Sequence, residues 1–317
     1  MSEQVVLGVD VGGTNVKAAI VSVSGEVMTA VSYPTDAEDG PERFVQRLYE
    51  QFIKLLQKSG CQLTDVLSVG VGLAGFLDVE HGYIEEAVNL HWRNVAIVQL
   101  LSESLHLPIY LDNDANIAAL GEAWQGAGQN AKSVLCVTLG TGVGGGIVLD
   151  GQIYRGVSTM AGEIGHITVK PGGPLCNCGR HGCLETLASA TALVNMGVAH
   201  GLHSPSGGTA NAEEIFALAK AGHRDAQQVI QELVNWLGVG LGIAANLLNP
   251  DKIVIAGGLV NAGDALMDPL RASFAANALQ RVYRSCELLP ATLGSRAGML
   301  GAARLAIQGA ALENSVL

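Results

Sequence analysis

One imidazole and three thiols lie close together in a short segment of this chain. His166 precedes Cys176 by ten positions, and Cys178 and Cys183 follow Cys176 within seven positions. Three sulfurs and one imidazole nitrogen are the donor set of a closed, four-coordinate structural zinc site. A disulfide explains the pattern poorly, because a Cys-x-Cys pair bridges with difficulty and a third cysteine would be left over. Three unrelated free thiols are the alternative, but free thiols rarely cluster so closely, so we predict a zinc site.

Carboxylates flank this cluster and recur in a second polar segment. Glu163 and Glu185 lie on either side of the predicted zinc ligands, where they could line a polar pocket. Residues 112–116 (Asp-Asn-Asp-Ala-Asn) follow a predicted strand, and ligands of parallel sheets bind at the carboxyl ends of strands. Asp114 there could accept a proton from a substrate hydroxyl during phosphoryl transfer. The alternative is a helix cap, but residues 112–114 cannot all cap, so at least one polar group needs another explanation.

Two Gly/Thr segments each lie between apolar runs and could bind phosphate. The first covers residues 10–14 (Asp-Val-Gly-Gly-Thr) and the second covers residues 140–144 (Gly-Thr-Gly-Val-Gly). Three positions of the two segments align at one constant offset, which indicates a weak duplication of a β-hairpin: Leu7, Val9 and Gly12 with Leu135, Val137 and Gly140. Backbone N–H groups and hydroxyls of two such turns could clasp a triphosphate. Ordinary tight hairpins are the alternative.

Two better-known nucleotide motifs are excluded. Gly140, Gly142 and Gly145 match G-x-G-x-x-G, but the strand-like residues 146–149 follow them, whereas a dinucleotide-binding fold needs a helix there. The sequence also contains no G-x-x-x-x-G-K-[ST] phosphate loop.

The rest of the chain alternates predicted helices and strands. The helices are expected at residues 42–58, 115–125, 226–248 and 298–308, and the strands at residues 67–73, 108–111 and 252–256. This order is typical of an α/β fold with mainly parallel sheets, here built twice, each with a leading antiparallel hairpin. We expect a smaller α/β domain over residues 1–118, completed by a C-terminal helix within 298–317. A larger α/β domain over residues 119–297 would hold the zinc motif.

Length, composition and charge limit the class of protein to which this chain can belong. The 317 residues are enough for two domains, and the 41 glycines are expected at tight turns and ligand-binding loops. A net charge of −11 without a basic stripe argues against a nucleic-acid partner. We see no signal peptide and no membrane-spanning run, and residues 237–248 are expected to form a buried core helix instead. Unpaired thiols without an export signal predict a cytoplasmic protein.

Together these motifs resemble the ROK family of sugar kinases and repressors, members of the actin-like ATPase superfamily with a ribonuclease H-like fold. The resemblance covers nearly the whole chain. Its carriers are residues 10–17, 113–116, 140–144, 163–166 and 176–185. Residues 87–92 (Ala-Val-Asn-Leu-His-Trp) look most like the bacterial glucokinase branch of the family.

The resemblance implies a role for each matching residue. Asp114 would be the general base, and Asp10 would lie near Mg²⁺. The residues implied to bind the sugar are Gly75, Asn89, Asn113, Asp114, Glu163, His166 and Glu185. Those implied to bind ATP are Asp10, Gly12, Gly13, Thr14, Lys17, Thr141 and Gly142 at the phosphates, and Gly257 and Gly258 near the adenosine. His166 would serve twice, with one ring nitrogen on zinc and the other toward the sugar.

The activity implied is phosphorylation of D-glucose at its 6-hydroxyl by ATP and Mg²⁺. The alternatives are a kinase for N-acetylglucosamine, N-acetylmannosamine, fructose or allose, or one that uses polyphosphate or ADP. A sugar-responsive repressor is also conceivable, but such proteins carry an N-terminal helix-turn-helix domain, and the first strand is expected here by about Val5. The implied partners are a sugar and a nucleotide, with no nucleic acid and no membrane. As relatives are often dimers or tetramers, we expect a homo-oligomer.

Overall fold

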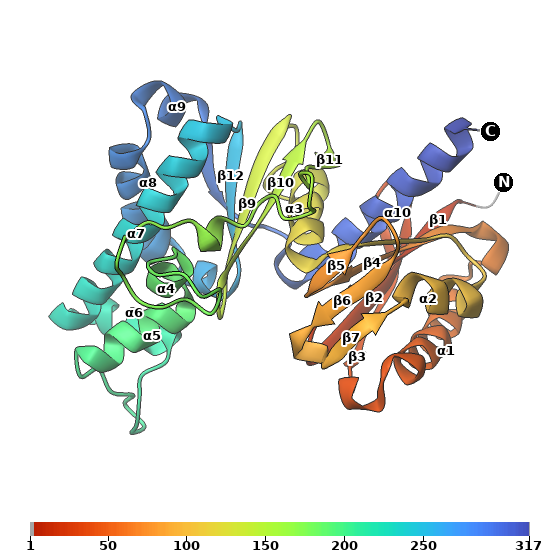
Figure 1. Cartoon of the computed structure of the whole chain (residues 1–317), viewed down its shortest axis with the longest axis horizontal. Helices are drawn as coiled ribbons and strands as arrows, with labels where there is room; N and C mark the ends of the chain where they lie inside the picture. Colours follow the sequence, from red (N-terminus) through yellow and green to blue (C-terminus); the bar gives the residue numbers. More distant parts are fainter. Residues whose placement is uncertain (1–2, 317) are drawn as a thin grey trace. The chain divides into compact units, whose positions relative to one another are not determined.

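The computed structural model describes residues 3–316 and divides into two compact units (Figure 1). The first unit comprises the chain up to Gln129, the short segment Gly151–Met160 and the C-terminal part from Ser295. The second unit comprises Asn130–Asp150 and Ala161–Gly294. Among the described residues, no helix is both long and apolar enough to cross a membrane.

The first unit is built on a five-stranded mixed sheet in the order β3-β2-β1-β4-β8. The strands are β1 (Val5–Val11), β2 (Asn15–Ser22), β3 (Val27–Pro34), β4 (Val66–Leu73) and β8 (Ile109–Asn113). Strands β1, β2 and β3 are antiparallel, whereas β4 runs parallel to both β1 and β8. A smaller antiparallel sheet contains β5 (Phe76–Asp78), β6 (Tyr83–Ala87) and β7 (Trp92–Val95). The helices are α1 (Pro41–Ser59), α2 (Ile97–Leu105), α3 (Asp114–Gln125) and α10 (Ala297–Val316).

The second unit contains most of a second five-stranded sheet, in the order β11-β10-β9-β12-β13. The strands are β9 (Ser133–Leu139), β10 (Val143–Leu149), β11 (Gln152–Ile153), β12 (Lys252–Ala256) and β13 (Glu287–Pro290). The helices are α4 (Glu185–Ala188), α5 (Ala190–Ala199), α6 (Ala212–Lys220), α7 (Arg224–Leu248), α8 (Asp264–Asn277) and α9 (Gln280–Ser285). Short 3₁₀ turns of the first unit are η1 (Ala37–Asp39), η2 (Leu63–Asp65) and η3 (Val88–Leu90). Those of the second unit are η4 (Ile164–His166) and η5 (Gly258–Ala262), and η6 (Gly294–Arg296) lies at the boundary.

The two sheets follow one plan. In each, an antiparallel hairpin leads, and its first strand then pairs in parallel with a later strand: β1 with β4, and β9 with β12. A further parallel strand follows at the edge, β8 in one sheet and β13 in the other. The predicted repeat of a hairpin is therefore confirmed, and it extends to the order of the whole sheet.

The local signals read from the sequence explain several elements. Helix α1 begins with Pro41 at its first position and ends at Gly60, whose φ of 75° lies in the left-handed region that favours glycine. Its apolar face buries Phe44, Leu48 and Phe52, as the 3.6-residue spacing predicts. The prediction of a helix at residues 42–58 is confirmed.

Some glycines serve close packing rather than turns, which corrects the expectation from composition. Helices α3 and α10 approach so closely that a Cβ on Gly121 would lie 2.2 Å from the carbonyl oxygen of Ala297. A Cβ on Gly301 would lie 1.6 Å from that of Ile117. In the sheet beneath, a Cβ on Gly70 of β4 would lie 1.8 Å from the Ala302 carbonyl of α10. Only residues without a Cβ permit this contact between backbones.

This packing also places the unit boundary elsewhere than expected. A division between residues 118 and 119 would cut helix α3, whereas the compact unit keeps α3 whole beside α10. The same unit includes Gly151–Met160, which the sequence analysis assigned to the larger domain.

The end of helix α7 differs from the sequence expectation as well. Leu237 and Leu241 are buried, but Ile243, Leu247 and Leu248 are 44%, 82% and 37% exposed. Residues 237–248 are therefore not a fully buried helix, because the helix turns one apolar side outward in its last two turns.

Candidate active site and metal centre

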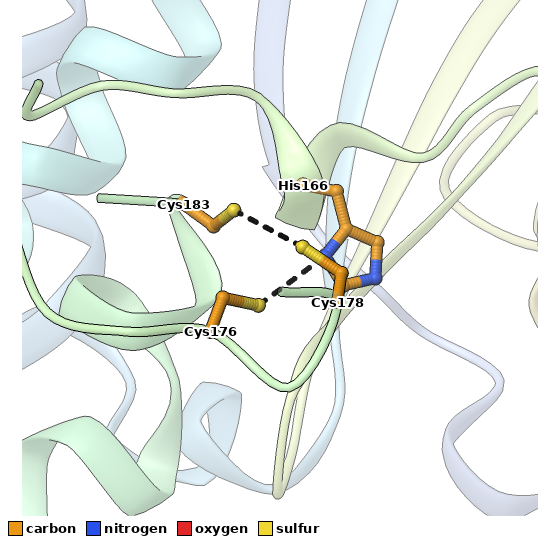
Figure 2. A group of neighbouring side chains, drawn as sticks. All are labelled: His166, Cys176, Cys178 and Cys183. Carbon is orange, nitrogen blue, oxygen red and sulfur yellow. Dashed lines mark hydrogen bonds between the residues drawn. The ribbon is translucent and has the colours of Figure 1, made fainter. Parts of the chain in front are cut away.

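The four predicted zinc ligands meet in the second unit. Figure 2 shows the sulfurs of Cys176, Cys178 and Cys183 and the imidazole of His166 gathered around one point. The Sγ atoms of Cys178 and Cys183 are 3.6 Å apart, and Cys176 Sγ is 3.6 Å from His166 Nδ1. All four donor atoms lie within 4.8 Å of one another. The structure describes all six cysteines, and none of them forms a disulfide.

These distances fit a tetrahedral metal site. Zinc bonds of about 2.3 Å to sulfur and about 2.0–2.1 Å to nitrogen imply edges of about 3.8 Å between two sulfurs and about 3.6 Å between sulfur and nitrogen. A disulfide would need an S–S distance of about 2.05 Å. The donor set and its spacing therefore fit zinc and exclude a disulfide between Cys178 and Cys183.

The loop that carries the cysteines is closed by backbone hydrogen bonds. The Cys176 N–H donates to the Arg180 carbonyl at 2.8 Å, and the Gly179 N–H donates back to the Cys176 carbonyl at 2.9 Å. An isolated bridge between Thr168 and Cys183 ties the end of the loop to its start. This turn places Cys176 and Cys178 on the same side of the loop.

The protonation of the thiols depends on their surroundings. The Arg180 backbone and side chain donate to Cys178 and lower the pKa of its thiol to about 6, which favours the thiolate that binds metals. Burial raises the pKa of Cys183 to about 12 and also raises that of Cys176. A cation between the sulfurs would offset this cost by stabilising the thiolates.

Two carboxylates lie beside the cluster. His166 Nδ1 faces the sulfur of Cys176, while its Nε2 lies 3.9 Å from Glu163 Oε2. Glu185 Oε1 lies 3.8 Å from Cys176 Sγ, and its Oε2 accepts the Val143 N–H at 3.2 Å. One ring nitrogen of His166 thus faces the metal ligands and the other faces away, the arrangement that a double role requires.

The glycine turn between β9 and β10 lies against Glu185. A Cβ on Gly142 would lie 2.1 Å from Glu185 Oε2, so a larger residue there would displace that carboxylate. Thr141 is exposed at the tip of the turn. Gly257 follows β12 with a φ of 91°, and a Cβ there would lie 2.3 Å from the Leu139 carbonyl. The parallel pairing of β9 with β12 thus brings Gly257 and Gly258 beside the turn.

In the first unit, the carboxyl ends of three parallel strands are in register. Val11 of β1 pairs with Leu73 of β4, and Leu73 pairs with Asn113 of β8. Loops that follow such aligned strand ends form the ligand-binding edge of parallel sheets. Three of the predicted site segments begin here: the turn after Val11, the Ala74-Gly75 pair and the start of α3.

The junction of β8 with α3 answers the question of which residue caps the helix. Asn113 is the N-cap: its Oδ1 accepts the Ala115 N–H at 2.9 Å, and its Nδ2 donates to the Gly75 carbonyl at 3.4 Å. Asp114 follows as the first helical residue, and its Oδ1 also accepts the Ala115 N–H at 2.9 Å. Burial raises the pKa of Asp114, which makes its carboxylate a stronger base. Asp112, by contrast, is 1% exposed and is bound by Arg155.

Asp10 belongs to the same region of the first unit. Burial raises its pKa to about 6; Lys17, its partner across the hairpin, lowers the value, and the charge of Asp114 raises it. The two carboxylates therefore interact electrostatically. Helix α10 starts against Asp10, because a Cβ on Gly298 would lie 2.5 Å from its Oδ2. In the turn that follows Asp10, a Cβ on Gly13 would lie 3.1 Å from the Cβ of Asn89.

Sequence reasoning missed residues that support this region. Thr35, fully buried, donates its N–H to the Thr14 carbonyl at 2.9 Å and its hydroxyl to the Gly12 carbonyl at 2.7 Å. Arg47 Nη2 in turn donates to the Thr35 carbonyl at 2.7 Å. Gly298 and Arg155 were also missed. None of these lies in a recognisable motif, so no local signal could have identified them.

The predicted site residues thus fall into two sets, one in each unit. The first unit holds Asp10, Gly12, Gly13, Thr14, Lys17, Gly75, Asn89, Asn113 and Asp114. The second holds Thr141, Gly142, Glu163, His166, Cys176, Cys178, Cys183, Glu185, Gly257 and Gly258.

Comparison with known proteins identifies the family of this chain. The model of the ROK family matches residues 6–309. The chain belongs to the ROK family. A curated relative, the glucokinase of Halalkalibacterium halodurans, is 43% identical over 100% of this chain and 98% of its own length. The crystal structure of a ROK hexokinase from Thermus thermophilus matches with a TM-score of 0.84 at 32% identity, covering 99% of this chain and 100% of that one. A ROK glucokinase from Streptomyces griseus, solved with glucose and AMPPNP, matches with a TM-score of 0.76 at 34% identity, covering 96% of this chain and 100% of that one.

Proposed function

We propose that this protein is a glucokinase that transfers the γ-phosphoryl group of ATP to the 6-hydroxyl of D-glucose, giving glucose 6-phosphate and ADP. The full-length relative from Halalkalibacterium halodurans is a glucokinase, and the Streptomyces griseus structure contains glucose and AMPPNP. The observation in this chain that carries the proposal is Asp114. It lies at the carboxyl end of a parallel strand beside Asn113, which hydrogen-bonds Gly75, and burial raises its pKa.

The proposed chemistry follows from these side chains. Asp114 accepts the proton of the sugar 6-hydroxyl as that oxygen attacks the γ-phosphorus in line. N–H groups of the turns at residues 12–14 and 141–142 stabilise the charge on the phosphoryl oxygens. Asp10 supplies the hard carboxylate oxygen that Mg²⁺ prefers, so it would hold this ion near the phosphates, where Mg²⁺ neutralises developing charge. Lys17, next to Asp10 across the hairpin, would add a further cation, and Gly257 and Gly258 would let the nucleotide approach.

For the Cys/His cluster we propose a structural Zn²⁺ bound by His166, Cys176, Cys178 and Cys183. All four positions are protein ligands, so the ion would have no open site for catalysis. Its role would be to fix the imidazole of His166 and the carboxylates of Glu163 and Glu185, which we propose as sugar ligands together with Asn89 and Asn113. Residues that contact the ligands of a metal orient those ligands.

We further propose that the two compact units are the two domains of an actin-like, ribonuclease H-like fold, with a duplicated hairpin and a zinc-binding insert. The shared order of the two sheets supports this proposal. A cytoplasmic location is supported by six described cysteines without a disulfide, which are typical of a reducing compartment. We propose a homo-oligomer, dimer or tetramer, with a sugar and a nucleotide as its small-molecule partners.

The nearest alternative is a kinase for another hexose. His166, held by the cluster, could not easily move aside for an N-acetyl group at C2, and a site built to bind hydroxyls rejects analogues that leave its polar groups unpaired. The test is kcat/KM for glucose, mannose, fructose, allose, N-acetylglucosamine and N-acetylmannosamine, with ATP, ADP and polyphosphate as donors. We expect glucose with ATP to give the highest value. An N-acetyl sugar that equals glucose would contradict the glucokinase assignment and leave the kinase assignment standing.

A further inference from the structure

Asp112 is a buried carboxylate that the proposed mechanism does not use. It is 1% exposed, yet four donors surround it. Its Oδ1 accepts the backbone N–H of Asn113 and the side-chain Nδ2 of Asn116, both at 2.8 Å. Its Oδ2 accepts Nε and Nη2 of Arg155 at 2.7 and 2.6 Å. A carboxylate has about four acceptor positions, so Asp112 is fully occupied and is not available as a base.

Asp112 binds residues on both sides of Asp114 in the sequence. Asn113 precedes Asp114 and Asn116 follows it within the first turn of α3, and both are held by the same carboxylate oxygen. The backbone of Asp114 is therefore fixed on both sides. Asn113 also fixes the start of α3 and the backbone at Gly75, because its side chain caps the helix and donates to the Gly75 carbonyl.

Arg155 is the cation paired with this carboxylate inside the protein. A buried charge without a partner is strongly unfavourable, so loss of Arg155 would favour movement of Asp112 toward water. The segment Gly151–Met160 that carries Arg155 is held within the first unit. Gln308 Nε2 donates to the Gly151 carbonyl at 2.6 Å, and the Thr159 hydroxyl lies 3.5 Å from the Leu77 carbonyl.

We propose that Arg155 is a positioning residue for phosphoryl transfer: through Asp112 it fixes Asn113 and Asp114 in the geometry that the reaction needs. This inference rests on the proposed kinase function. Arg155 itself does not touch the substrate in this account. Without it, the first turn of α3 would loosen, and displacement of a reacting group by about 1 Å can lower a rate by roughly 100-fold.

The test compares Arg155→Met and Arg155→Lys with the wild type. We expect Arg155→Met to lower kcat by about 10- to 100-fold while KM for ATP stays within about twofold, because the nucleotide turns are untouched. Arg155→Lys keeps the charge but offers one donor nitrogen instead of two, so kcat should fall less than in Arg155→Met. The matched control is Arg271→Met, which removes another Arg–Asp pair, the exposed contact with Asp268 on α8, and should leave kcat unchanged.

A second readout does not depend on activity. Amide hydrogen exchange of residues 112–117 should be faster in Arg155→Met than in the wild type or in Arg271→Met. If Arg155→Met does not fold, Arg155→Lys decides the matter by the same two measurements. A folded variant with wild-type kcat and unchanged exchange would overturn the proposal. A wild type without activity on any hexose would contradict the proposed function instead, and the exchange measurement would still test the role of Arg155.

Discussion

Two partly buried carboxylates, Asp10 and Asp114, carry the proposed chemistry at the scale of single residues. Burial raises the pKa of each, and the charge of Asp114 also raises that of Asp10. Holding two such groups near each other is unfavourable for folding, so their presence indicates a function that needs their charge. In the proposed mechanism, Asp114 would transfer the proton and Asp10 would bind the magnesium of the nucleotide.

The unfavourable burial of the Asp10 carboxylate predicts that Asp10→Asn raises the free energy of unfolding in a pH-dependent way. The Asp10 pKa is about 6 when folded and 3.8 in the reference state. Between these values the folded chain keeps a proton that the unfolded chain has released, so wild-type stability falls as pH rises through this window. Above about pH 6 the penalty is constant. Since asparagine does not ionise, the advantage of Asp10→Asn should grow from about pH 4 and level off at about 3 kcal/mol.

Urea unfolding of both proteins at several pH values, without added Mg²⁺, measures this difference. An advantage for Asp10→Asn that is the same at pH 4.5 and pH 7.5 would show that Asp10 is not desolvated as the structure indicates.

At the scale of elements, each site segment is held by contacts from elsewhere in its own unit. The cysteine loop is closed by its own backbone, and its position beside Glu185 places it against the β9–β10 turn. The turn after β1 is held by Thr35, which follows β3. In both cases, we expect a substitution in the residue that holds the segment to alter the site, although that residue does not itself bind substrate or metal.

Loss of the metal should destabilise the second unit. We expect about one zinc per chain in the wild type and much less in Cys178→Ser, because a hydroxyl replaces one of four ligands. The melting temperature of the variant should fall by roughly 5–10 °C, equivalent to about 2–3 kcal/mol for a unit of this size. Cys61→Ser is the control, since Cys61 is half-buried and lies outside the cluster. Elemental analysis and calorimetry give the answer; a zinc-free protein with unchanged melting temperature and full activity would refute a structural zinc.

Removal of the Thr35 hydroxyl should weaken nucleotide binding selectively. Thr35→Val leaves the Gly12 carbonyl without its side-chain donor and loosens the turn that we assign to the phosphates. We expect KM for ATP to rise by roughly 5- to 10-fold, about 1–1.4 kcal/mol, with KM for glucose unchanged. Thr35→Ser keeps the hydroxyl and should behave as the wild type. Equal rises in both KM values would contradict a specific role in the nucleotide turn.

Local patterns in the sequence predict much of this architecture. Pro41 and Gly60 delimit α1, the spacing of three cysteines and His166 identifies the metal cluster, and the repeated Gly/Thr segments indicate the two hairpins. These features depend on neighbours in the chain, so the sequence displays them directly.

Contacts between distant parts of the chain could not be predicted in the same way. Arg155 meets Asp112 across 43 positions, and Thr35 meets Gly12 across 23, with no pattern in either segment to signal the partner. The glycines of α3 and α10 were missed for a similar reason. Gly121 and Gly301 have normal helical neighbours, and only the packed structure shows that a Cβ there would collide with the other helix.

The whole molecule repeats one plan. Both sheets have a leading antiparallel hairpin and two further parallel strands, and each unit carries its own glycine turn and its own polar residues. The first unit supplies the proposed base and magnesium ligand, and the second supplies the metal cluster with Glu163 and Glu185. Membership of the ROK family, over residues 6–309, extends across both units. The family match therefore includes both sets of proposed site residues.

The central claim is that this chain makes glucose 6-phosphate with Asp114 as the base. The most direct measurement is ³¹P NMR of the purified protein with ATP, Mg²⁺ and D-glucose, run beside Asp114→Asn. Asparagine keeps the size and hydrogen bonding of the side chain but cannot accept the proton. The account predicts that glucose 6-phosphate and ADP form together in the wild type, and that the rate falls by roughly 10²–10⁴-fold in the variant while glucose still binds. Phosphorylation at another hydroxyl, no product, or a variant as fast as the wild type would contradict it.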